Sequence, residues 1–94
     1  MQILGQIALK TAARKHADAA NALAMWRAAA AAARRRNFAQ LKADFPSADY
    51  VPPFTVFNVK GNKYRLIALI DYAEQIVVVR YVLTHATYSK GKWK

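Results

Sequence analysis

Three side chains late in the chain are of types that can cut RNA without a metal ion: Arg65, His85 and Tyr88. In such a reaction the ribose 2′-OH is the nucleophile, and the protein aligns the backbone, moves protons and stabilises charge on the phosphorus oxygens. A guanidinium binds phosphate, an imidazole transfers protons near neutral pH, and a phenol stacks on a base or donates its hydroxyl. A single histidine after a strand is more often structural, so both interpretations of His85 stay open.

A predicted β-hairpin sets the position of Arg65. Gly61 and Asn62 form a two-residue loop of the II′ type, with glycine where a positive φ is required. Side chains alternate between the two faces of a strand, so this loop places Asn58 opposite Arg65 on one face. We expect this face to bind a ligand. Solvated guanidiniums on an open sheet face are the simpler alternative.

A second predicted reversal, at residues 73–74, adds the third strand of the sheet. Regular pairing then places Ile67 opposite Arg80 and Arg65 opposite Val82, so the two arginines share a face. The opposite face is predicted to be the core face and consists of Phe57, Val59, Tyr64, Leu66, Ala68, Ile70, Tyr72, Val77, Val79, Tyr81 and Leu83.

The composition indicates a polyanionic partner. The chain has 94 residues, with 15 Lys and Arg against 5 Asp and Glu, which gives a formal net charge of +10. A charge of this size on so short a chain favours nucleic acid over a neutral substrate. Basic residues occur in both halves of the sequence, so they belong to the fold and not to a basic tail. The length fits one domain covering residues 1–94.

Several classes of function are disfavoured by what the sequence lacks. Without cysteine and with 2 histidines there is no thiolate chemistry and no convincing zinc site, so we expect no metal and no cofactor. The sequence has no glycine-rich phosphate loop, no nucleophile elbow and no paired carboxylates. It also lacks a signal-peptide layout and an apolar stretch long enough to span a bilayer. These features predict a soluble, cytoplasmic protein without a membrane partner.

Hydrophobic spacing predicts the elements of the first half. A short strand at residues 1–5 precedes a helix over residues 7–16 and a longer, alanine-rich helix over residues 19–35, with Asp18 as its N-cap. The arginines at 34–36 then lie at a helix C-terminus, where the helix dipole favours cations. Contact of these arginines with nucleic acid or a partner is the alternative.

The remaining elements complete the predicted fold. Asn37 can cap a short turn, and Pro52 and Pro53 enforce an extended link into the two hairpins. The resulting order is β-α-α-β-β-β. It predicts an α+β fold in which two helices pack on one face of a small, mostly antiparallel sheet.

Three blocks of the sequence resemble the HigB toxins of bacterial type II toxin–antitoxin modules. The blocks are residues 42–48 (KADFPSA), 56–66 (VFNVKGNKYRL) and 80–88 (RYVLTHATY), and their order and spacing fit the family. The resemblance implies a RelE-like fold and ribosome-dependent cleavage of mRNA in the A site, an mRNA interferase activity. It also implies neutralisation by a HigA antitoxin that carries a DNA-binding helix-turn-helix.

The resemblance implies roles for individual residues. Arg65, His85 and Tyr88 are expected to be catalytic, with Arg65 binding phosphate and stabilising transition-state charge. RelE-like toxins differ in using lysine, tyrosine or histidine as the base, so the base stays open. The residues that we expect to bind RNA are Asn58, Lys60, Asn62, Lys63, Arg80 and Lys90. The basic tail from Lys90 to Lys94 is either an rRNA contact or a solvated end, and operator DNA is expected to be bound only through the antitoxin.

Two other functions compete with an RNA-cleaving toxin. A non-catalytic RNA- or DNA-binding module would need the same charge and the same sheet face. A membrane-surface peptide is disfavoured, because the arginines and aromatic residues are divided between sheet and helices instead of forming one cationic helix. Cleavage of mRNA on programmed ribosomes, as opposed to protection alone, separates a toxin from a binding module.

Overall fold

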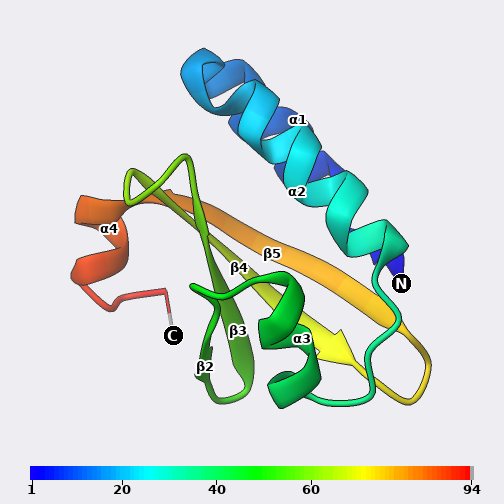
Figure 1. The fold of residues 1–94 in the computed structure, drawn as a ribbon. Helices are drawn as coiled ribbons and strands as arrows, with labels where there is room; N and C mark the ends of the chain where they lie inside the picture. The colour runs from blue at the N-terminus through cyan, green and yellow to red at the C-terminus, as the bar shows by residue number, and fades with distance from the viewer. Residues whose placement is uncertain (94) are drawn as a thin grey trace.

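The chain folds into a mixed sheet with several helices (Figure 1). The computed structural model describes residues 1–93. The elements are, in chain order, β1 (Gln2–Leu4), α1 (Gln6–Lys15), the 3₁₀ turn η1 (Ala17–Ala19), α2 (Ala20–Ala32), α3 (Phe38–Asp44), β2 (Asp49–Val51), β3 (Phe54–Val59), β4 (Tyr64–Asp71), β5 (Ile76–Thr84) and α4 (His85–Ser89). The predicted α+β class is confirmed, and β2, α3 and α4 are additions to the predicted order. None of the helices in residues 1–93 is long and apolar enough to cross a membrane.

The sheet has the strand order β1-β5-β4-β3-β2. β1 runs parallel to β5 and every other neighbouring pair is antiparallel, which confirms a mostly antiparallel sheet. Tyr64 at the start of β4 pairs with Val59 at the end of β3 and with Thr84 at the end of β5. The β3–β4 loop and the beginning of α4 therefore lie at the same end of the sheet.

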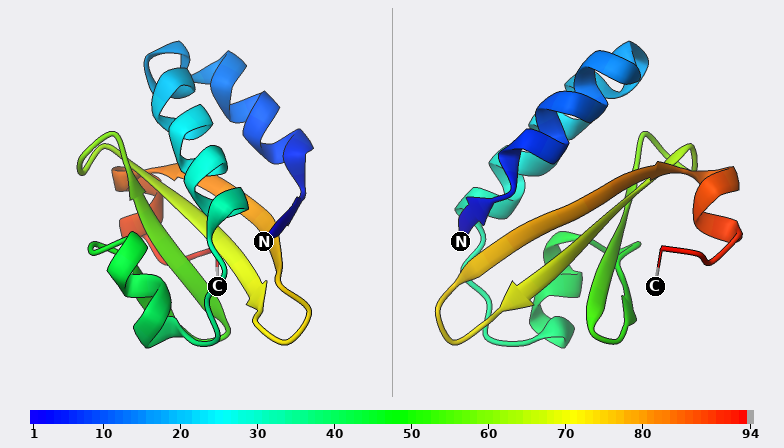
Figure 2. Two further views of the ribbon diagram at one scale, coloured as in Figure 1. Left: turned by 45° about the vertical axis from the view of Figure 1, so that its right-hand side comes forward. Right: turned by 180° about the vertical axis from the view of Figure 1, so that it is seen from behind.

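Helices cover one face of this sheet (Figure 2). α1 and α2 lie side by side as a helical hairpin, and α3 packs on the same face. Phe57 of β3 contacts both units, with ring centroids 5.4 Å from Trp26 of α2 and 4.9 Å from Phe45, which follows α3. The predicted helical layer on one face is confirmed, and α3 extends it.

The β3–β4 hairpin has the predicted register. Asn58 pairs with Arg65, and the backbone N–H of Lys63 donates to the carbonyl oxygen of Lys60 across the turn, at 3.2 Å. Gly61 has a φ of 62°, as the predicted turn requires.

The β4–β5 hairpin departs from regular pairing at a β-bulge. The register shifts between Ile67 and Ala68: Ile67 pairs with Tyr81 and Ala68 pairs with Val79. Arg80 is therefore the extra residue on β5. The predicted pairing of Ile67 with Arg80 is wrong.

The bulge also changes which β5 side chains face the core. Arg65 pairs with Leu83 instead of Val82, and Val82 packs against the core. One inserted residue exchanges the two faces of the strand beyond it. For this reason the predicted core positions Tyr81 and Leu83 are wrong, and so is the shared face of Arg65 and Arg80.

Asp18 does not cap α2, contrary to prediction. The turn η1 precedes this helix, and no side-chain oxygen caps the first residues of either element. The Asp18 carboxylate instead accepts hydrogen bonds from the β3–β4 hairpin. By contrast, Asn37 caps α3 as predicted, because its Oδ1 accepts a 2.9 Å hydrogen bond from the backbone N–H of Gln40.

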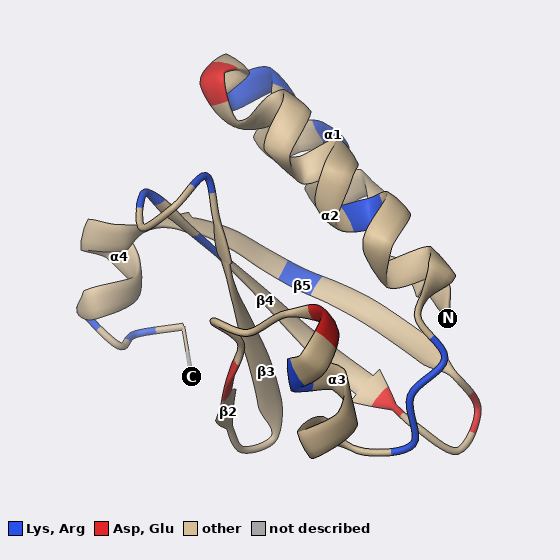
Figure 3. Cartoon of the chain, in the orientation of Figure 1, with Lys and Arg blue, Asp and Glu red and all other residues tan. Residues whose placement is uncertain are grey.

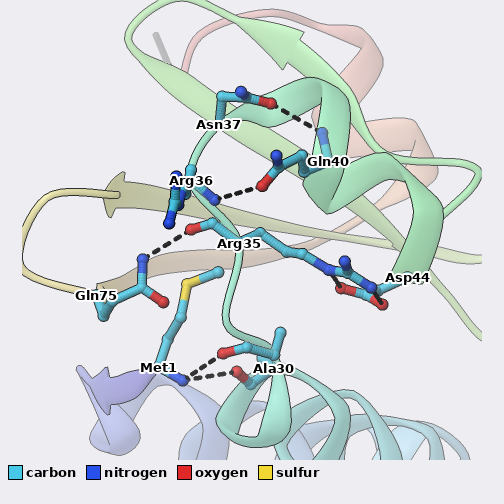
Figure 4. A network of polar contacts seen from close by, with 9 residues as sticks. Met1, Ala30, Arg35, Arg36, Asn37, Gln40, Asp44 and Gln75 are labelled. Carbon is cyan, nitrogen blue, oxygen red and sulfur yellow. Dashed lines mark hydrogen bonds and ion pairs between the residues drawn. The ribbon is translucent and has the colours of Figure 1, made fainter.

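A polar network closes the end of α2, which stops at Ala32 and not at residue 35 (Figure 4). The amino group of Met1 donates to the carbonyl oxygens of Ala31 and Ala33, at 2.9 and 2.7 Å. Arg35 donates two hydrogen bonds of 2.8 Å to Asp44 of α3. This arginine therefore joins the segment after α2 to α3, and the prediction that it lies on the last turn of the helix is wrong.

Candidate active site

The guanidinium of Arg65 is the centre of a polar cluster where the β3–β4 loop meets α4. Arg65 is only 8% exposed. Its Nη1 donates to the backbone oxygens of Asn62 and Tyr64, at 3.1 and 3.2 Å. Its Nη2 donates to the side-chain oxygen of Asn62 and lies 3.1 Å from Nδ1 of His85. Asn62, Arg65, His85 and the adjacent Tyr88 are called the Arg65 cluster below.

These contacts occupy both terminal nitrogens of the guanidinium. Each terminal nitrogen carries two hydrogens, and each faces two acceptors here. A bidentate phosphate contact of the kind expected for Arg65 therefore requires some of these bonds to open. The structure brings Arg65 and His85 together but does not display the arginine to solvent.

His85 lies at the first position of α4, and the Nδ1 atom of its ring points toward Arg65. Thr84 caps this helix by accepting a 3.2 Å hydrogen bond from the backbone N–H of Thr87. A guanidinium has no acceptor, so Nδ1 must be the acceptor and the proton of the neutral ring is assigned to Nε2. In this arrangement His85 can donate a hydrogen bond from Nε2. Uptake of a second proton at Nδ1 requires the contact with Arg65 to break.

Tyr88 of α4 is packed between other groups of the cluster and the segment that follows. The Arg65 guanidinium carbon lies 5.5 Å from the centroid of its ring. Trp93 stacks on the same ring at 5.1 Å and an interplanar angle of 18°, and its Nε1 donates to the Tyr88 carbonyl oxygen at 3.0 Å. Trp93 also meets Phe54 of β3 edge to face, at 5.6 Å. A base that stacks on Tyr88 would compete with Trp93, so the Tyr88 hydroxyl is the more available group.

Trp93 was missed by the sequence analysis, which treated the tail only as a charged segment. The packing of Trp93 does not fit a solvated end, and an rRNA contact by the tail stays a prediction. Lys90 is exposed just beyond α4, so it remains a candidate for RNA binding. Lys94 lies outside the described residues.

Lys60 and Lys63 point away from Arg65 and contact Asp18 at the tip of the helical hairpin. The distances to the Asp18 carboxylate are 3.4 Å from Lys60 Nζ and 2.8 Å from Lys63 Nζ, and the hydroxyl of Tyr64 donates to the same group at 2.7 Å. The hydrogen bond from Lys63, followed by that from Tyr64, holds the pKa of Asp18 well below its usual range. The same bond raises the pKa of Lys63. The structure thus directs both lysine side chains toward Asp18, although the backbone carbonyl of Lys63 accepts a 3.0 Å hydrogen bond from the backbone N–H of His85.

Arg80 is also separate from this cluster. Its guanidinium carbon lies 5.9 Å from the ring centroid of Tyr81, and the residue lines a hollow of about 290 Å³ between β5 and α1. The β-bulge is the cause, because it removes Arg80 from regular alternation with the residues opposite Arg65.

A second hollow, of about 400 Å³, opens beside the Arg65 cluster. Its lining residues are Lys42, Pro46, Ser47, Ala48, Asp49, Val56, Asn58, Arg65 and Tyr88. A larger hollow, of about 490 Å³, lies at the end of α2, but it is lined by alanines, Arg34 and the ion pair of Arg35 with Asp44. The hollow beside Arg65 therefore combines two predicted catalytic residues, Arg65 and Tyr88, with the predicted RNA-binding residue Asn58.

Lys42, Ser47 and Asp49 are the lining residues that the sequence analysis missed. Residues 42–48 belong to the first block of the family resemblance, which was a signal that this segment matters. Asp49 starts β2, an edge strand that was not predicted, so nothing local indicated that it faces Arg65.

Comparison with known proteins identifies the family. The family model that matches residues 19–91 describes HigB toxins, the RelE-like toxic component of a toxin-antitoxin system. The chain belongs to the HigB toxin family. It is 35% identical over 91 residues to the mRNA interferase toxin HigB of Escherichia coli K12, and the alignment covers 94% of this chain and 88% of that protein. The mRNA interferases HigB of Escherichia coli O157:H7 and Shigella flexneri match equally well.

The match includes the whole candidate site of this HigB family member. The Arg65 cluster and the hollow beside it lie within residues 19–91, whereas Trp93 follows the matched segment. The resemblance seen in the sequence is thus confirmed. Membership of a toxin–antitoxin family implies an antitoxin as partner.

Proposed function

We propose that this chain is an endoribonuclease that cuts mRNA on the ribosome and so inhibits translation. The observation that carries the proposal is the convergence of three predicted catalytic residues, with Arg65 3.1 Å from His85 and 5.5 Å from the ring centroid of Tyr88. The relatives named as mRNA interferases support it. The net charge of +10 supports attraction to the ribosome, whose RNA is a polyanion.

Arg65 and His85 divide the chemistry in this proposal. The substrate phosphate replaces hydrogen bonds of the Arg65 terminal nitrogens, and the guanidinium then stabilises charge on the phosphorus oxygens as the 2′-OH attacks. Nδ1 of His85, released from Arg65, takes up the proton that the attacking 2′-OH loses. The resulting imidazolium donates a proton to the leaving 5′-oxygen, and cleavage leaves a 2′,3′-cyclic phosphate and a 5′-hydroxyl. The reaction needs no metal ion.

Programmed ribosomes carrying end-labelled mRNA test the proposal. Wild-type protein should cut within the A-site codon and leave the cyclic phosphate. Arg65→Ala should lower cleavage about 100-fold or more, because it removes the group that stabilises transition-state charge. Arg27→Ala, an exposed arginine of α2, is the matched control and should cut at the wild-type rate. Protection of the mRNA without cut ends would favour a non-catalytic binding module instead.

We further propose that the antitoxin is of the HigA type, with a helix-turn-helix, and that this chain reaches operator DNA only through it. The site of action is then the cytoplasm, where ribosomes are. Expression of the chain alone should arrest growth, and co-expression of a helix-turn-helix protein encoded beside it should restore growth. Normal growth at a verified level of folded protein would contradict the toxin function.

A further inference from the structure

Strand register builds the hollow beside Arg65. Asp49 of β2 pairs with Val56 of β3, and Asn58 of β3 pairs with Arg65 of β4. Paired residues point to the same face of a sheet, as do residues two apart on one strand. Asp49, Asn58 and Arg65 therefore share a face. Tyr50, the next residue of β2, points to the opposite face and contacts α3.

Three polar side chains of this hollow make no polar contact with the described part of the protein. Within residues 1–93, the side chains of Ser47, Asp49 and Asn58 form no hydrogen bond and no ion pair. Both terminal nitrogens of Arg65 beside them are already occupied by hydrogen bonds within the protein. Unused polar groups that converge on one hollow are typical of a ligand site, and a volume of about 400 Å³ is ample for one.

The carboxylate of Asp49 has the wrong charge for binding the RNA backbone. It repels phosphate and, when ionised, it can only accept hydrogen bonds. Its place beside the phosphate-binding arginine of a chain with a net charge of +10 is therefore not explained by attraction to a polyanion. The neutral donors that RNA offers are the 2′-OH and the N–H groups of the bases.

We propose that this hollow is a base-reading subsite, in which Asp49 accepts a hydrogen bond from the exocyclic amino group of a base beside the cut phosphate. The inference rests on the proposed cleavage of RNA and adds a specificity determinant to it. Adenine, cytosine and guanine carry such an amino group. Uracil carries the carbonyl oxygen O4 where cytosine carries its amino group, and its N3–H donor is flanked by O4 and O2, both of which the carboxylate repels, so uridine is disfavoured. Asn58 and Ser47 are placed to meet the other polar atoms of the base.

Codons that differ at one nucleotide test this subsite on programmed ribosomes. At the position that the hollow contacts, wild-type protein should cut uridine about tenfold more slowly than the other nucleotides, the scale of one discriminating contact. Asp49→Asn preserves the shape and provides both a donor and an acceptor, which match the O4 and N3–H of uracil. This variant should cut uridine-containing codons faster than wild type does and the other codons more slowly. A purely structural defect would lower cleavage of all codons alike.

Glu74→Gln is the matched control, because it removes the same charge from an exposed position in the distant β4–β5 loop. It should keep the wild-type order of codons. If Asp49→Asn also keeps that order, the subsite is overturned and the proposed cleavage stands.

A binding measurement separates failure of the subsite from failure of the proposed function. Nuclear magnetic resonance can follow the side-chain amide of Asn58 during titration with the four nucleoside 3′-monophosphates. The three amino-bearing bases should bind at least about threefold more tightly than uridine to the wild type, and Asp49→Asn should remove the difference. Equal affinities in the wild type would overturn the subsite even if no ribosome-bound mRNA were cut.

Discussion

Arg65 is held by short-range contacts that the sequence predicted only in part. The turn at Gly61 fixed its partner Asn58, because a two-residue loop determines register. Its burial was not predictable, since it depends on Asn62 folding back onto the guanidinium and on α4 bringing His85 against it. Strand periodicity describes faces, whereas these contacts depend on the detailed path of a loop and of a short helix.

His85→Gln separates proton transfer from hydrogen bonding. The glutamine oxygen can still accept a hydrogen bond from Arg65, so the Arg65 cluster should remain assembled. Glutamine cannot carry an extra proton, so single-turnover cleavage on programmed ribosomes should fall about 100-fold or more. Ribosome co-sedimentation should be unchanged.

His16→Gln is the control for that substitution. His16 lies 4.9 Å from the Tyr64 ring at the helical hairpin, outside the Arg65 cluster, and its replacement should leave the rate of cleavage unchanged. A wild-type rate for His85→Gln would reduce His85 to a hydrogen-bonding partner of Arg65.

At the scale of elements, the sequence predicted the features that depend on neighbouring residues in the chain. It did not predict the features that depend on contacts between distant segments. Asn37 and Gly61 act through their own backbone neighbours, and both were assigned correctly. Asp18 has a residue type that favours helix N-caps, but lysines from a distant loop compete successfully for its carboxylate. The bulge at Arg80 leaves no mark in the sequence, because an inserted residue in a β-branched run looks like regular alternation.

Gly5 connects β1 to α1 where the chain passes close to β5. Its φ is 77°, and a Cβ would lie 2.3 Å from the carbonyl oxygen of Val79. Gly5→Ala should lower the free energy of unfolding in urea by about 3 kcal/mol, from left-handed strain and from displacement of the β5 backbone.

Gly91→Ala isolates the conformational part of that effect. Gly91 has a φ of 71°, but nothing lies within 4 Å of a Cβ at this position. Its replacement should cost about 1 kcal/mol, the penalty of the left-handed region alone. Equal effects of the two substitutions would show that β5 accommodates the added methyl group without cost.

Asp18 makes the docking of the helical hairpin sensitive to acid. Hydrogen bonds from Lys63 and Tyr64 lower its pKa in the folded state, so the folded protein binds this proton less readily than the unfolded chain. The stabilisation is complete above the unfolded-state pKa of about 4 and is lost as the pH falls below it. Asp18→Asn should therefore flatten the fall in Tm between about pH 5 and pH 3, as measured by calorimetry.

Asp44 limits how far Asp18→Asn can flatten the fall in Tm at low pH. Arg35 lowers the pKa of Asp44 in the same direction, so part of the acid sensitivity should survive in Asp18→Asn. Glu74→Gln is the control and should keep the wild-type dependence on pH. If Asp18→Asn left the dependence of Tm on pH unaltered, the pKa of Asp18 would be equally low in the folded protein and in the unfolded chain.

Over the whole molecule, basic residues are dispersed. Figure 3 shows Lys and Arg on the helical hairpin, the segment after α2, the β3–β4 loop, β5 and the segment after α4. The sequence predicted the total charge and its spread along the chain. It did not predict that Asp18 and Asp44 neutralise basic side chains between elements, because these ion pairs exist only after the elements have packed.

The occupied terminal nitrogens of Arg65 should make cleavage depend on the ribosome. A free oligonucleotide offers few contacts, whereas the ribosome offers an extended anionic surface to a chain with a net charge of +10. We expect the larger surface to supply the binding energy that opens the contacts of Arg65 with Asn62 and His85. Free mRNA should be cut about 100-fold more slowly than the same mRNA on ribosomes. Equal rates in a direct comparison would contradict this coupling.

Latency is the biological consequence of that arrangement. With its proposed phosphate-binding group occupied by its own loop and helix, the protein should be harmless to the many RNA molecules that it meets by diffusion. Selectivity then comes from the work needed to open the site, and it requires no recognition of a long sequence. If cleavage depends on the ribosome as we propose, a cell should tolerate a small leak of such a protein past its antitoxin, because damage would begin only where a translating ribosome holds the substrate.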